Sequence, residues 1–110
     1  MSFAALLTDR AHLLAREPGR ERWARLTAEP LPCRVVFLSP REVEMALAQA
    51  HAEVTHRGRC LPNPHVKPGR KLALLGGPVY LILAVVHVPN PRPHGHLVLD
   101  LQALPPETEA

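Results

Sequence analysis

A run of ten almost entirely apolar residues, Val79 to Val88, restricts the fold more than any other feature of this chain. Gly76-Gly77-Pro78 precedes it and Pro89 follows it, and both are typical of turns. The run is apolar on both faces and much shorter than the ~20 residues of a membrane-spanning helix. It therefore predicts a central β-strand that is buried on both faces.

Three further segments are predicted to be strands. Lys71–Leu75 lies just before the Gly-Gly-Pro turn, and in Leu97–Gln102 every second residue is leucine, which indicates a half-buried strand. Together with the apolar run they predict an antiparallel meander. Cys33–Leu38 is short and rich in β-branched residues, which favours a buried strand.

A helix is predicted to follow the Cys33–Leu38 strand. Ser39-Pro40-Arg41-Glu42 has the spacing of a capping box, with proline at the first helical position and glutamate at the third. An apolar stripe then runs through Val43, Leu47, Ala50 and Val54. Gly58 is well placed to end this helix in a left-handed conformation.

Two more helices are predicted near the N-terminus. Phe3, Leu7, Ala11 and Leu14 recur at three-to-four spacing, which is one face of a helix. Pro18-Gly19 would end that helix, and a shorter one is expected over residues 21–28.

The predicted fold class is therefore α+β, with the element order α-α-β-α-β-β-β. The middle β-α-β unit predicts a parallel, right-handed crossover. The result would be a two-layer domain with a four-stranded mixed sheet and helices packed on one face. With 110 residues the chain fits one compact domain, predicted over residues 1–104, followed by a flexible acidic tail at 105–110.

The composition indicates where the protein is located and what kind of organism encodes it. There is no signal-peptide pattern, and two cysteines are too few for a disulfide framework, so we expect a soluble cytoplasmic protein with reduced thiols. Arginine outnumbers lysine eleven to two, and there are 13 prolines. Both biases are typical of a GC-rich genome or a heat-adapted host, and they weaken any argument from single arginines.

Positive charge is concentrated in one stretch. No Asp or Glu occurs between Val54 and Leu99, and the predicted topology gathers the loops of this stretch at one edge of the sheet. Cationic side chains there would attract phosphates. The leading hypothesis is a non-enzymatic accessory protein that binds nucleic acid, a ribonucleoprotein or an acidic protein. The predicted contacts are Arg57, Arg59, Lys67, Arg70, Lys71 and Arg92.

Two alternatives remain open. The pair His94 and His96, with His65 and Cys60, has the donor types that zinc prefers, so a metal-binding domain is the second hypothesis. A structural homodimer without a ligand is the third. The only serines, Ser2 and Ser39, are interpreted as helix caps, which makes a serine nucleophile improbable. No catalytic residue is assigned, and no cofactor is predicted.

Overall fold

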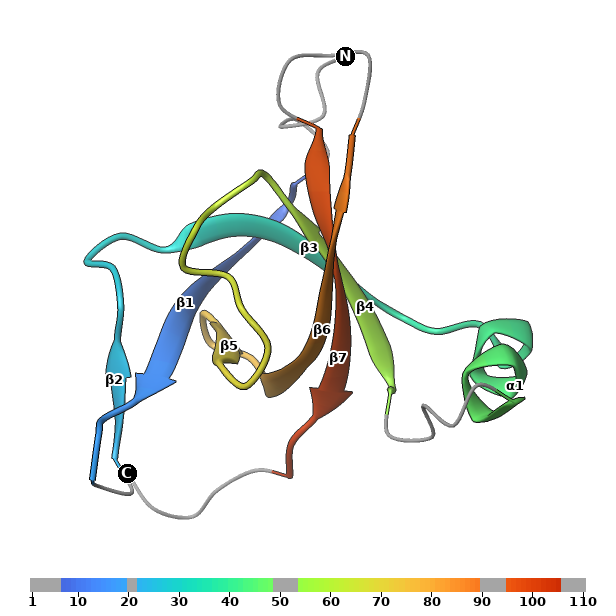
Figure 1. The fold of residues 1–110 in the computed structure, drawn as a ribbon, viewed down its shortest axis with the longest axis horizontal. Coiled ribbons are helices and arrows are strands. Elements are labelled where there is room, and N and C mark those ends of the chain that lie inside the picture. Colours follow the sequence, from blue (N-terminus) through green and yellow to red (C-terminus); the bar gives the residue numbers. More distant parts are fainter. Residues whose placement is uncertain (1–6, 20–21, 49–53, 90–94, 106–110) are drawn as a thin grey trace.

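The computed structural model describes residues 7–19, 22–48, 54–89 and 95–105. Within them the chain forms seven strands and one helix (Figure 1). The elements are β1 (Asp9–Arg16), β2 (Trp23–Arg25), β3 (Leu31–Phe37), α1 (Pro40–Ala48), β4 (His56–Cys60), β5 (Lys71–Leu74), β6 (Val79–Val88) and β7 (His96–Ala103).

The strands form a closed antiparallel barrel. The hydrogen-bonded order is β2-β1-β3-β4-β7-β6-β5, and an additional pairing of β1 with β5 closes six of the strands into a ring. Strand β2 lies outside this ring and pairs with the far end of β1. Closure satisfies the backbone groups that the two edges of an open sheet would leave unpaired.

The predicted fold class is wrong. In place of an α+β domain with a four-stranded mixed sheet and packed helices, the described residues form a closed β-barrel with one helix outside it, and all their strand pairings are antiparallel. The β-α-β crossover fails because Gly58 is not a helix stop. It lies in the middle of β4, a strand that sequence reasoning missed, and β4 runs antiparallel to β3.

The two predicted N-terminal helices are also wrong over the described residues. Leucine, alanine and arginine favour helix only weakly, by tenths of a kcal/mol per residue. Strand β1 instead pairs over residues 9–14 with β3 and β5, which are distant in the sequence, and over residues 14–16 with the neighbouring β2. Ala11 and Leu13 then point into the barrel and are fully buried.

Several local predictions are confirmed. The meander appears as β5, β6 and β7, and the strand predicted after Pro30 appears as β3, although β3 is buried on one face only and not throughout. The capping box is present, because the Ser39 N–H donates to Glu42 Oε1 at 3.1 Å and the Glu42 N–H donates to Ser39 Oγ at 3.2 Å. Helix α1 begins at Pro40 and stands outside the barrel (Figure 1).

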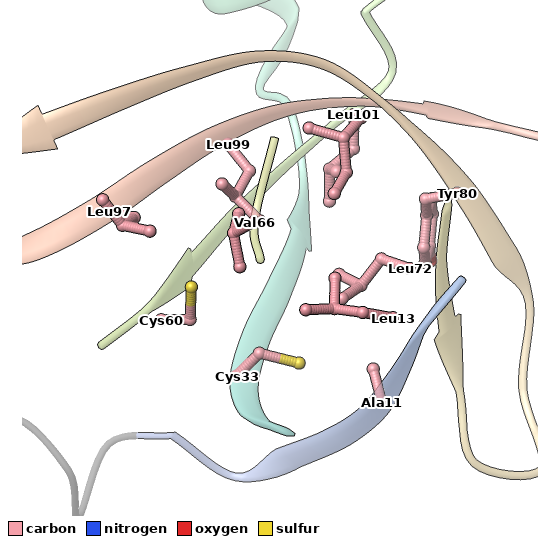
Figure 2. Close-up of a cluster of buried hydrophobic side chains, with 11 residues drawn as sticks. Ala11, Leu13, Cys33, Cys60, Val66, Leu72, Tyr80, Leu97, Leu99 and Leu101 are labelled. Atoms are coloured by element: carbon pink, nitrogen blue, oxygen red, sulfur yellow. The ribbon is translucent and has the colours of Figure 1, made fainter. Parts of the chain in front are cut away.

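The barrel interior is filled by side chains, as expected for so few strands. Leu13, Leu72, Ile82, Leu99 and Leu101 are the largest buried side chains. The loop at residues 61–70 folds over this core and contributes Val66, which is 5% exposed (Figures 1 and 2). No helix in the described ranges has the length and apolar character to cross a bilayer. The predicted acidic tail, from residue 106 on, lies outside the described residues.

Candidate functional site

Strand β4 carries two of the predicted cationic contacts on the outside of the barrel. His56, Gly58 and Cys60 are buried, and the alternating Arg57 and Arg59 point outward. Sheet register places Arg57 between Val36 of β3 and Asp100 of β7. It places Arg59 between Arg34 of β3 and Val98 of β7. The two arginines therefore have different neighbours although they are only two residues apart.

Arg57 is held by two carboxylates. Its Nη1 donates to Glu42 Oε2 at 2.7 Å, and its Nε lies 3.5 Å from Asp100 Oδ1. The Nε contact is one of charge, because that buried atom has no hydrogen-bond partner among the described residues. Hydrogen bonds from Ser39 lower the pKa of Glu42, with smaller contributions from Arg57 and Arg59. Arg57 thus fastens α1 to the barrel and is poorly placed to receive a partner.

Arg34 and Arg59 stand directly opposite each other on adjacent strands. Both are exposed, and Arg10 of β1, also exposed, faces Pro32 and so lies diagonally across from Arg34. We call Arg10, Arg34 and Arg59 the arginine row. No carboxylate in the described part of the chain lies within ion-pair distance of these three side chains. Like charges directly opposite in a sheet repel each other, so Arg34 and Arg59 form an unfavourable pair that a bound anion would stabilise.

An apolar border follows the arginine row around the barrel. Val98 of β7 lies beside Arg59, and Val86 of β6 lies beside Val98. Val86 is 56% exposed, and Val36, next to Arg34 on the same face of β3, is 36% exposed. The outer surface of β3, β4, β7 and β6 thus passes from arginines to valines over four neighbouring strands.

The other predicted cations that the structure describes lie on other elements. Lys71 is on β5, which lies opposite β4 in the six-strand ring, and its Nζ sits 4.2 Å from the centre of the Trp23 ring. Arg70 Nη1 donates to the carbonyl of His65 at 2.7 Å. Lys67 is exposed in the loop at 61–70, and Arg92 lies outside the described residues. The predicted cations that the structure describes are therefore distributed over β4, β5 and the loop at 61–70.

The predicted metal ligands are likewise dispersed. Cys60 points into the barrel and is fully buried, whereas His96 is on the outer face of β7, beside the inward Leu97 that pairs with Cys60. His65 is exposed in its loop, where its N–H donates to Asn63 Oδ1. His94 lies outside the described residues. Across the described ranges, no three His, Cys, Asp or Glu side chains are grouped closely enough to hold a metal ion.

One end of the barrel carries a small aromatic cluster that sequence reasoning missed. The Phe37 and His56 ring centroids are 4.2 Å apart, and those of His56 and Tyr80 are 4.8 Å apart. Phe37 is 80% exposed although it was predicted to lie in a buried strand. Burial lowers the pKa of His56, whose Nδ1 is 2.8 Å from Thr55 Oγ1.

The arginine row was missed for a different reason. Arg10 and Arg34 lie outside the acid-free stretch that begins at Val54, so the charge pattern along the chain does not point to them. The alternation of Arg34 with Cys33 and Val35 already marked it as an outward strand residue. Comparison of the chain with family models, curated proteins and solved structures finds no match.

Proposed function

We propose that the protein is a non-enzymatic nucleic-acid-binding module in which the arginine row contacts backbone phosphates. The observation that carries this proposal is the opposition of Arg34 and Arg59, two exposed arginines that face each other across β3 and β4. This surface replaces the loop edge expected from the sequence. The proposal includes a cytoplasmic location, where nucleic acid is accessible.

The geometry of the row suits a phosphate. Arg34 and Arg59 form a hydrogen-bonded strand pair, whose Cα atoms are typically about 5.5 Å apart. Two guanidinium groups rooted this close can share one phosphate group, and each presents a planar fork that matches phosphate oxygens. A phosphate bound between Arg34 and Arg59 would attract both guanidinium groups and offset their mutual repulsion.

The row is long enough for more than one phosphate. Arg10, Arg34 and Arg59 lie on three consecutive strands, which span about 10 Å across the sheet. The partly exposed Val98 beside Arg59 and the exposed Val36 and Val86 give the partner an apolar border, where sugars of the backbone can pack. Because the contacts are to the backbone, we expect affinity with little base specificity.

The test is fluorescence anisotropy of labelled duplex DNA, structured RNA and single strands. Three phosphate contacts on a duplex predict a slope of about −2.7 in log K against log salt, or roughly 40-fold weaker binding at about 200 mM than at about 50 mM. The variant Arg34→Glu/Arg59→Glu should lose binding at both salt concentrations.

A matched control makes the same charge change elsewhere. Arg25 of β2 and Arg41 of α1 are exposed and lie off the row, so Arg25→Glu/Arg41→Glu should retain most of the binding. Equal loss in both double variants would mean that only net charge matters. Binding to polyglutamate in place of nucleic acid would assign an acidic protein partner and contradict the proposal.

A further inference from the structure

Two cysteines face each other inside the barrel. Cys33 of β3 and Cys60 of β4 are direct partners in the antiparallel register, and both are fully buried. Both are free thiols in this structure. In Figure 2 they lie at the same end of the core, with their sulfur atoms pointing in different directions.

The hydrogen-bond pattern shows which kind of pair they form. The Leu38 N–H donates to the Thr55 carbonyl at 3.2 Å, so the hydrogen-bonding groups of Leu38 face the β4 side just beyond the end of the β3–β4 ladder. Pair types alternate along an antiparallel ladder, so Cys33 and Cys60, five positions away, are a non-hydrogen-bonded pair. Accordingly, the Val35 N–H, in the next pair of the same type, turns away from β4 and donates to Asp9 Oδ2.

A non-hydrogen-bonded pair brings its side chains closest. Its Cα atoms are typically about 4.5 Å apart, which is within the range of roughly 4.4–6.8 Å found across disulfides. A side-chain rotation about χ1 is then enough to bring the two sulfurs together, without movement of either strand. The backbone of β3 and β4 is thus already arranged for a cross-strand disulfide.

We infer that Cys33 and Cys60 are a dithiol–disulfide site, oxidised while the chain folds or opens and protected from oxidation while it stays folded. This inference is independent of nucleic-acid binding. In a reducing cytoplasm the dithiol is the resting form, and the disulfide forms in chains that fold during an oxidative challenge.

The chemistry requires a small disulfide such as oxidised glutathione. One cysteine thiolate attacks it, which forms a mixed disulfide and releases one glutathione thiolate. The other cysteine thiolate then attacks the protein sulfur of that mixed disulfide and releases the second glutathione thiolate. The two protein thiols lose two electrons and two protons, and oxidised glutathione is reduced to two molecules of glutathione.

The folded barrel slows this reaction in two ways. No part of either residue is accessible to a solvent-borne oxidant. Burial also raises the pKa of Cys33 to about 12, with smaller contributions from Asp9 and Cys60, and raises the pKa of Cys60 to about 11. At neutral pH about one thiol in ten thousand or fewer is the reactive thiolate. Oxidation therefore needs the unfolded or opened chain.

The experiment compares refolding with the folded state. Reduced protein is unfolded in urea and refolded by dilution into a series of buffers, in which glutathione ranges from fully reduced to mostly oxidised. The reaction is quenched in acid and the protein is alkylated under denaturing conditions. Mass spectrometry then gives the mass of each product. We expect a monomer that is two hydrogens lighter and takes up no alkyl group. Folded reduced protein in the same oxidised buffer should convert at least tenfold more slowly.

The oxidised monomer should also be more stable. The bond closes a loop of about 28 residues, which predicts a melting temperature roughly 10 °C higher than that of the reduced protein. Cys33→Ala and Cys60→Ala are the matched controls and should show no such rise. Wild-type protein that refolds with two alkylatable thiols, with glutathione adducts only or as disulfide-linked dimers would overturn the inference. So would equally fast oxidation of the folded protein.

Discussion

The inner and outer faces of β3 and β4 differ sharply in residue size and charge, although successive residues of each strand belong to opposite faces. Inside, Cys33, Gly58 and Cys60 are small and tightly enclosed. Outside, Arg34 and Arg59 repel each other in contact with solvent. The inner face contributes stability through burial, whereas the outer face carries a charge arrangement that folding alone does not require.

The largest effect is expected inside the barrel, on β7. Leu99 is fully buried, and its neighbour Val98 lies on the outer face. Leu99→Ala should lower the free energy of unfolding by about 2–5 kcal/mol, because it removes buried apolar contacts and leaves a cavity. Val98→Ala should cost less than about 1 kcal/mol. Urea denaturation measures both, and similar losses would show that the outer face is also buried.

A smaller loss is expected where the inner face has no room. A Cβ added to Gly58 would lie 3.0 Å from Leu101 Cδ1, and Leu101 is fully buried. Gly58→Ala should therefore destabilise the barrel by about 1–3 kcal/mol through overpacking. In the double variant with Leu101→Val, the two losses should sum to more than the measured total. Additive losses would locate the strain elsewhere.

On the outer face the expected change has the opposite sign. Arg34→Glu would place a carboxylate directly opposite Arg59, so the free energy of unfolding should rise by about 0.2–1 kcal/mol. Nucleic-acid binding should weaken in the same variant. Urea denaturation and anisotropy give the two values. A destabilised Arg34→Glu would mean that Arg34 has a structural role, which would undermine the proposed binding surface.

The smallest expected effect is a pH dependence at the aromatic end of the barrel. Burial lowers the pKa of His56 below its ordinary value in the folded state. As the pH falls below about 6.5 the unfolded chain takes up the proton first, so stability is full above that pH and is lost below it. His56→Gln should flatten the profile of unfolding free energy between pH 7.5 and 5. His65→Gln, in the exposed loop, makes the same substitution away from the barrel end and is the matched control.

The candidate sites differ in how far the sequence could predict them. Arg59 was identified as a cationic contact, but its partner Arg34 was not, because their opposition depends on the pairing of β3 with β4. The face-to-face placement of Cys33 and Cys60 depends on the same pairing. Spacing along the chain cannot reveal contacts between residues about 25 positions apart.

The sequence by itself determined the elements whose signals are local. The capping box at Ser39 and Glu42 starts α1, and the apolar run between two turns forms β6 with its meander partners. Only the tertiary structure decided β1, β2 and β4, and with them the closed barrel. Their residues have weak or helical local preferences, and hydrogen bonds to distant strands outweigh those preferences. Ring closure by β1 and β5 joins segments about 60 residues apart, and no local pattern encodes it.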